Sequence, residues 1–254
     1  MGNGKRDKRI GIPSPIHHDK NLCEDCSIVD RCVVHKLMGQ QALNRMGFIT
    51  SKAYPPGKKI YAEGEPLGSL HLLCSGLVFG SLFNRNPNES LIYLARSGSF
   101  LDLLDQAEGQ NQIHTCSAET LTPSVVAFFN YRRLRDVTME DASFAWDMFD
   151  MAIKRLRQLT DWHVSLAFGD AKSKVVFFLL ELAEAAGKWD HPHVSIPLKL
   201  RRQVWAQAAG ISVETVSRVM RELNQTGYIE ETPVSLEIRD VRPLQKIAGE
   251  HDAA

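Results

Sequence analysis

The chain has 254 residues, of which 44% are hydrophobic and 24% are charged, and its 30 basic and 30 acidic residues cancel. This composition is typical of a globular protein long enough for two modest domains. No stretch approaches the roughly 18 uncharged apolar residues of a transmembrane helix, and residues 1–20 lack the apolar run of a signal peptide. We therefore expect a cytoplasmic protein. Because nonspecific affinity for DNA depends on neutralised phosphates, a chain of zero net charge would need a specific motif to bind DNA.

The N-terminal half is predicted to be a cysteine-containing leader followed by a β domain. Residues 1–20 read as a flexible tail, and residues 21–138 hold the leader and the β domain. From about residue 50 to residue 131, short apolar runs alternate with turn signals such as Pro55-Pro56-Gly57 and Ser75-Gly76, a spacing typical of a β-sandwich or barrel. The expected strands are Ser69–Leu73, Leu77–Phe83, Leu91–Leu94 and Ser124–Phe129.

A long helix is predicted over residues 139–168, where the chain has no Pro or Gly between Met139 and Ala167. Its apolar residues recur at steps of three and four, which trace one face of a helix. They are Ala145, Phe149, Ala152, Leu156, Leu159, His163 and Leu166. This stripe could pack on the β domain or against the same helix of a second subunit. We expect a homodimer, because the domain that follows needs a symmetric partner.

Residues 169–254 are predicted to form a winged helix-turn-helix. A helix over Ala171–Ala186 and a β-turn-β unit over Lys188–Pro197 precede it. A short helix, about Arg201–Ala209, is followed by Gly210 at a sharp turn and by Ser212, a good N-cap for a second helix. That second helix would bury Val216, Val219, Met220 and Leu223, and Tyr228–Arg239 would supply a two-stranded wing.

The second helix carries residues suited to reading DNA bases. The candidate DNA-binding residues are Glu214, Thr215, Ser217, Arg218 and Arg221. Arg218 can donate two parallel hydrogen bonds to guanine, and Glu214 can accept one from the amino group of cytosine. Ser217 is short enough to let the helix approach the groove. The sequence therefore predicts double-stranded DNA as a partner.

The run Val213-Glu214-Thr215-Val216-Ser217-Arg218 resembles the recognition helix of the CRP/FNR superfamily of bacterial regulators, in particular its FNR branch. The β domain is also similar to that family, in Pro56-Gly57-Lys58-Lys59-Ile60 and in Gly64-Glu65. The resemblance implies an α+β architecture with a cyclic-nucleotide-binding-like β-roll, a long dimerisation helix and a C-terminal winged helix-turn-helix. It also implies a transcription regulator that binds palindromic sites with half-sites like TTGAT and works with RNA polymerase.

Two departures argue against cyclic-nucleotide binding. Members that bind cyclic AMP carry a Gly-Glu pair in the phosphate loop and an arginine that meets the phosphate. The matching stretches here are Gly98-Ser99-Phe100-Leu101 and His114-Thr115, which lack the glutamate and the arginine. A phosphate buried there would find no charged side chain in these two stretches with which to form a charge-assisted hydrogen bond. We also find no catalytic triad, phosphate loop or paired-carboxylate site, so an enzyme is not expected.

Three cysteines, Cys23, Cys26 and Cys32, form a C-x2-C-x5-C arrangement. Thiolates suit iron–sulfur clusters and zinc alike, so the spacing does not choose between them. The resemblance implies an oxygen-labile [4Fe-4S] cluster with a fourth cysteine from the β-roll. Redox-active thiols without a metal are a further alternative. In the competing function, the cysteines hold zinc or act as redox thiols, and a small effector in the β-roll gates the regulator.

The fourth ligand is where the chain departs from the FNR branch, because Val126 stands at the corresponding position. We favour Cys116, since a hairpin around Thr120–Ser124 could bring its strand beside that of Val126. Cys74 and a non-cysteine ligand are the alternatives. The predicted cluster ligands are therefore Cys23, Cys26, Cys32 and Cys116.

Overall fold

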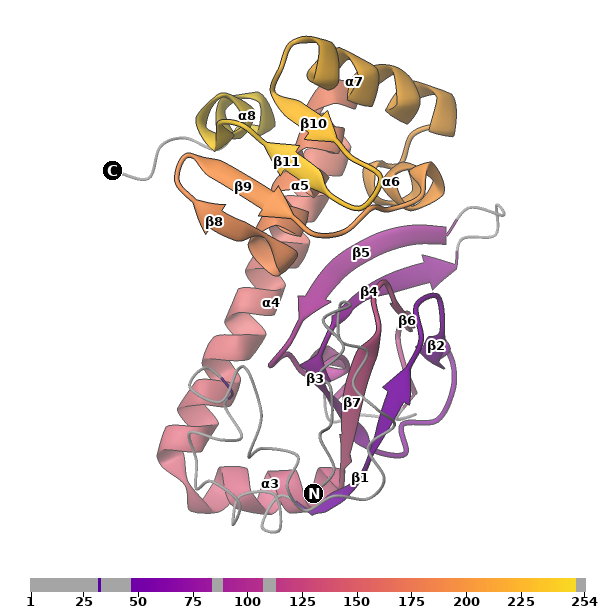
Figure 1. Ribbon diagram of the computed structural model, residues 1–254. Helices are drawn as coiled ribbons and strands as arrows, with labels where there is room; N and C mark the ends of the chain where they lie inside the picture. Colours follow the sequence, from indigo (N-terminus) through magenta and orange to yellow (C-terminus); the bar gives the residue numbers. More distant parts are fainter. Residues whose placement is uncertain (1–31, 33–46, 84–88, 107–112, 250–254) are drawn as a thin grey trace, which may run out of the picture.

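The structure, a computed structural model, describes Cys32 and residues 47–83, 89–106 and 113–249 (Figure 1). An antiparallel β domain comes first, a long helix follows, and a smaller domain of helices and strands lies at the far end of that helix. This is the predicted α+β order. None of the described helices is both long and apolar enough to cross a membrane.

The β domain consists of two antiparallel sheets with the strand orders β1-β7-β3 and β2-β6-β4-β5. The strands are β1 (Phe48–Tyr54), β2 (Lys59–Tyr61), β3 (Leu70–Ser75), β4 (Leu77–Phe83), β5 (Glu89–Arg96), β6 (Ser117–Thr120) and β7 (Ser124–Phe129). Side chains from both sheets, such as Leu73 and Val126 from one and Val78 and Ala118 from the other, share one buried group. The four predicted strands correspond to β3, β4, β5 and β7.

The turn between β3 and β4 requires glycine. Gly76 has a φ of +99°, and a Cβ atom there would lie 2.2 Å from Oγ of Ser124. A side chain would therefore face both a left-handed backbone and a steric clash. This explains the Ser-Gly turn signal found in the sequence.

The predicted hairpin around Thr120–Ser124 is wrong. β6 pairs with β2 and β4, whereas β7 pairs with β1 and β3, so the two strands lie in different sheets. At the corner between them, the N–H of Leu77 donates to Oγ1 of Thr122 over 2.9 Å. Cys116 and Val126 still share a buried group, because the two sheets face each other.

The helical region is divided in two at Asp141 instead of running unbroken from Met139. The helices are α3 (Tyr131–Glu140) and α4 (Ala142–Phe168). The carboxylate of Asp141 accepts hydrogen bonds from the N–H groups of Ser143 (3.0 Å) and Phe144 (3.1 Å). Asp141 is therefore the N-cap of α4, and its extended backbone ends α3.

The apolar residues of α4 lie on several faces instead of the one predicted stripe. Leu159 packs against the β-domain core, and Leu166 packs against the core of the C-terminal domain. Phe149 and Leu156 of the predicted stripe are exposed. They belong to an exposed apolar face made of Trp146, Phe149, Ile153, Leu156, Val164 and Phe168. The stripe divides because α4 contacts the β-domain core as far as Leu159, whereas Trp162 and Leu166 pack against the core of the C-terminal domain.

The C-terminal domain holds α5 (Ala171–Ala186), α6 (Arg202–Ala209), α7 (Val213–Gln225) and α8 (Val241–Ala248). Its sheet has the order β10-β11-β9-β8, with β8 (Lys188–Asp190), β9 (His193–Ile196), β10 (Ile229–Glu231) and β11 (Leu236–Ile238). Trp205 of α6 is almost fully buried in its core. That core continues into Phe79 and Leu91, which belong to β4 and β5. The domain therefore packs on the β4–β5 hairpin as well as on α4.

Candidate nucleic-acid interface and the cysteines

The helix-turn-helix forms where the sequence predicts it. Gly210 ends α6 in the left-handed conformation, with φ 61° and ψ 34°. Ser212 caps α7, because its side chain accepts a hydrogen bond from the N–H of Thr215 over 3.2 Å. The predicted wing strands are β10 and β11, which pair in antiparallel register. Local turn and cap chemistry therefore sets this motif.

The two faces of α7 separate buried apolar residues from exposed polar ones. Its buried residues are Val216, Val219, Met220 and Leu223, the four predicted from the sequence. Glu214, Arg218 and Arg221 are exposed, while Thr215 and Ser217 are half-buried. Figure 1 shows α7 at the outer end of the C-terminal domain, away from the β domain. The exposed side of α7 is therefore open to a DNA groove, as a recognition helix requires.

The N-terminal turn of α7 has its own electrostatics. The N–H of Glu214 and the hydroxyl of Ser212 lower the pKa of the exposed Glu214 carboxyl, because both groups stabilise its ionised form. Ser217 turns its hydroxyl back to the carbonyl of Val213 over 2.8 Å. Glu214 is thus an ionised acceptor, whereas the Ser217 hydroxyl must leave its backbone partner to donate to a base.

Two ion pairs that the sequence did not reveal hold α7 and the wing in place. Lys172 of α5 contacts Glu222 of α7, with Nζ and Oε1 2.7 Å apart. Arg202, at the start of α6, makes a two-pronged pair with Glu231 of β10, one of whose bonds is 2.8 Å long. These partners lie 50 and 29 residues apart in the chain. Separations of this size carry no local sequence signal.

Of the cysteines predicted to hold a cluster, Cys23 and Cys26 lie outside the described residues. Cys32 is buried with Leu70 and Leu72 of β3, in a group that also contains Phe144 and Met148 of α4. Cys74 packs against this same group, since it follows Leu70 and Leu72 along one face of β3. The fold therefore brings Cys32 and Cys74 to one apolar region beside α4.

Cys116 lies in a different buried group, with Tyr61, Leu73 and Val126. Its Sγ is 3.9 Å from the hydroxyl of Tyr93. Burial is the main reason that the pKa of the Cys116 thiol rises to about 11, and the nearby Asp105 carboxylate adds to this. Cys116 as a cluster ligand stays a prediction, and its packing apart from Cys32 favours the alternative, Cys74.

Comparisons with known proteins agree with these two domains. Residues 51–141 match the cyclic nucleotide-binding domain family, and residues 173–247 match the Crp-like helix-turn-helix domain family. The cAMP-activated global transcriptional regulator Vfr of Pseudomonas aeruginosa is 27% identical over 180 residues, covering 70% of this chain and 84% of that protein. The Anaerobic regulatory protein of Pasteurella multocida is 21% identical over 229 residues, covering 89% of this chain and 82% of that protein.

Among solved structures, FixK2 from Bradyrhizobium japonicum aligns with a TM-score of 0.68 at 21% identity, covering 81% of this chain and 98% of that one. This likeness shows the fold. Regulators of the family bind DNA through the helix-turn-helix and act as dimers, and the relatives are not enzymes. With both family domains in this order around a capped, outward-facing recognition helix, the chain belongs to the CRP/FNR family of DNA-binding transcription regulators.

Proposed function

We propose that this regulator responds to oxygen or redox state through a [4Fe-4S] cluster held by Cys23, Cys26, Cys32 and one cysteine of the β-roll. When bound, the cluster supplies an oxygen-sensitive group that thiolates alone would not provide. The chemistry of the donor set fits, because iron–sulfur clusters are held by cysteine thiolates. We propose Cys74 as the fourth ligand, since it packs against the same apolar group as Cys32.

The observation that carries the proposal is the position of Cys32. It is only 6% exposed, and its buried group includes Phe144 and Met148 of α4. A change in how the leader packs at Cys32 therefore acts directly on the predicted dimerisation helix. Because half-sites one helical turn apart tolerate little error, a small movement of α4 would change DNA affinity.

One relative supports the same conclusion. The match to the Anaerobic regulatory protein covers 89% of this chain. Residues 47–254 alone make up a smaller share of the chain than that. It therefore reaches into the N-terminal segment that carries the cysteines. We further propose that the regulator binds palindromic DNA as a homodimer and acts through RNA polymerase.

The test is anaerobic purification followed by iron and sulfide analysis and by measurement of affinity for a palindrome of TTGAT half-sites, with and without air. Wild-type protein should contain iron and sulfide and should lose DNA affinity in air. Cys26→Ser should abolish both the iron content and the effect of air. If Cys26→Ser kept an air-sensitive DNA affinity, the N-terminal cysteines would not be the sensor. A colourless protein that contains zinc would also overturn the proposal.

A second candidate, a regulator gated by a small effector, is favoured by one cavity. It has a volume of about 680 Å³ and lies between the Ser97-Gly98-Ser99 turn, α4 and α5. Within the described residues, Nη1 of Arg155, which lines this cavity, is buried without a hydrogen-bond partner. An effector with an anionic group could bond to it if Arg155 moved off the ring of Tyr93, whose centroid lies 3.9 Å from the guanidinium carbon. In that case a small acid would change the DNA affinity of iron-free protein, and Arg155→Gln would remove this response.

A further inference from the structure

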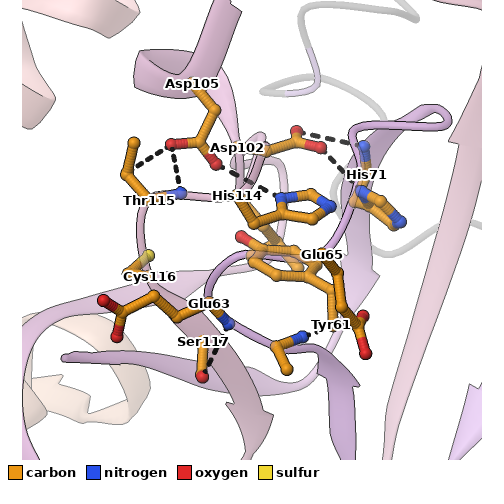
Figure 2. A network of polar contacts seen from close by, with 12 residues as sticks. Tyr61, Glu63, Glu65, His71, Asp102, Asp105, His114, Thr115, Cys116 and Ser117 are labelled. Carbon is orange, nitrogen blue, oxygen red and sulfur yellow. Dashed lines mark hydrogen bonds and ion pairs between the residues drawn. The ribbon is translucent and has the colours of Figure 1, made fainter. Parts of the chain in front are cut away.

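The interior of the β-roll holds a buried group of histidines and carboxylates that the proposed cluster does not use (Figure 2). It consists of His71 from β3, Asp102 and Asp105 from the segment after β5, and His114 from just before β6. Their side chains are 7%, 0%, 3% and 2% exposed, respectively. Possible ligand atoms of His71, Asp102 and His114 all lie within 4.8 Å of one another. Such close spacing of buried donors from three segments is what a metal site requires.

His114 is oriented by a second carboxylate. Its Nδ1 lies 3.3 Å from Oδ2 of Asp105, and the N–H of Thr115 donates to Oδ1 of Asp105 over 3.2 Å. The ring of Tyr61 stacks on His114 at a centroid distance of 3.7 Å. Figure 2 shows the opposite edge of the His114 ring, which carries Nε2, facing His71 and Asp102. Metal-bound histidines typically have this arrangement, with one nitrogen on a carboxylate and the other toward the ion.

His71 and Asp102 supply the other two donors. Nδ1 of His71 is 2.6 Å from Oδ2 of Asp102, and the backbone N–H of His71 donates to Oδ1 over 3.1 Å. Ligand atoms that lie about 2.1 Å from a tetrahedrally bound ion are about 3.4 Å from one another. The distance between Nδ1 of His71 and Oδ2 of Asp102 would therefore increase by less than about 1 Å when an ion binds. A change of that size needs only small side-chain rotations.

We propose that His71, Asp102 and His114 bind a divalent transition-metal ion, with Asp105 as the positioning residue for His114. Two imidazoles and one carboxylate suit Zn²⁺ or Fe²⁺ and do not suit Mg²⁺ or Ca²⁺, which prefer oxygen ligands alone. The charge also fits, because a divalent ion would balance the two buried carboxylates of Asp102 and Asp105. The site is separate from Cys32 and Cys74, which belong to another buried group.

The segment that carries Asp102 also contacts α4. The carbonyl of Phe100 accepts a hydrogen bond from Nη2 of Arg155 over 3.4 Å, and Phe100 shares a buried group with Phe144 of α4. The N–H of Leu101 donates to the carbonyl of His71 over 2.9 Å, which joins this segment to β3. A metal that moved Asp102 would therefore act on the predicted dimerisation helix from the side of the β-roll.

The test uses Zn²⁺ alone and full-length protein in which Cys23, Cys26 and Cys32 are replaced by serine, so that N-terminal thiols do not compete. Calorimetry should find one bound Zn²⁺ and no binding of Mg²⁺, and Zn²⁺ should raise the melting temperature. His71→Gln and His114→Gln should each weaken Zn²⁺ binding at least about tenfold, and Asp105→Asn should weaken it about 10–100-fold. His193→Gln, a histidine of the C-terminal domain, is the matched control and should bind Zn²⁺ like the parent.

X-ray absorption on the Zn²⁺-loaded parent keeps the proposal testable if a histidine variant fails to fold. It should find nitrogen and oxygen neighbours that include two imidazoles. A parent that bound no Zn²⁺, or that bound it without imidazole neighbours, would overturn the proposal. So would histidine variants that bind Zn²⁺ as tightly as the parent, since the four residues would then form only a buried hydrogen-bond network.

Discussion

Trp162 of α4 donates its indole N–H to the carbonyl of Ala208 in α6 over 3.2 Å. Ala208 lies in the last turn of α6, where carbonyl groups have no partner within the helix. Trp162 is almost fully buried and packs edge-on against Phe177 of α5. This single side chain therefore joins the long helix to the first helix of the helix-turn-helix.

The first prediction concerns this link. Trp162→Phe should keep most of the ring packing but leave the buried carbonyl of Ala208 without its partner, which costs about 1–3 kcal/mol. Urea unfolding measures this change in the free energy of unfolding. Val234→Ala, at a side chain that is 70% exposed between β10 and β11, is the control and should stay within about 0.5 kcal/mol of wild type. Equal losses in both variants would show that the indole bond contributes nothing measurable.

A second prediction concerns base reading by α7. Arg218→Ala should weaken binding to the preferred duplex by about 1–3 kcal/mol and should relax the preference at one base pair of each half-site. Competition binding with single-base variants of the site measures both effects. Arg242→Ala is a control, because Arg242 is exposed on α8 and pairs with Asp240. A loss of affinity that is equal for all sequences would make Arg218 a phosphate contact.

The exposed apolar face of α4 gives a third prediction. Leu156 is 55% exposed on this face, so Leu156→Asp removes little intramolecular packing. In a dimer built on this face, it would place two carboxylates near the two-fold axis, where neither stays charged easily. Sedimentation should then find monomers, and DNA affinity should fall in parallel. Ser143→Asp, at the exposed start of α4, should leave the dimer intact. A Leu156→Asp protein that remains dimeric would move the interface elsewhere.

The choice of fourth cluster ligand is a fourth prediction. Cys74→Ser should remove most of the iron from anaerobically purified protein, because Cys74 packs with the group that contains Cys32. Cys116→Ser should keep its iron, since Cys116 lies in a buried group separate from the one that contains Cys32. Iron content measured per protein chain decides between them. The reverse result would support the ligand set with Cys116 that the sequence favoured.

Glu181 of α5 gives a pH-dependent prediction. Burial raises the pKa of its carboxyl, although a hydrogen bond from Nε2 of Gln158 over 2.7 Å acts in the opposite direction. The folded protein therefore holds this proton more tightly than the unfolded chain does. The stability that comes from this bound proton is present at pH values below about 4.3, which is the pKa of the carboxyl in the unfolded chain. It is lost as the pH rises through the raised pKa of the carboxyl in the folded protein.

Glu181→Gln cannot ionise, so it should be more stable than wild type at pH about 7 and no more stable at pH about 4. Thermal unfolding at both pH values measures this difference. Glu230→Gln, at an exposed residue of β10 that does not contribute to the raised pKa of Glu181, is the control and should stay within about 0.5 kcal/mol of wild type at both pH values. A stability gain for Glu181→Gln that did not depend on pH would rule out the buried carboxylate as its cause.

Much of this protein follows from local sequence. The turn at Gly210, the cap at Ser212 and the buried face of α7 are each determined by neighbouring residues, and all three were predicted correctly. The β-roll strands likewise follow from short apolar runs between turn signals. These features depend on backbone conformation and helical periodicity, which act over a few residues.

Only the tertiary structure decided which distant side chains meet. The sequence pointed to Cys116 through a hairpin, but β6 and β7 lie in different sheets, and Cys74 packs against the buried group that contains Cys32. The predicted stripe on α4 divided, because Leu159 and Leu166 pack against two different domains. His71, Asp102 and His114 gave no motif, since they come from three separate segments of the chain. Contacts of this kind depend on how sheets and helices pack, and no local pattern of residue types records that packing.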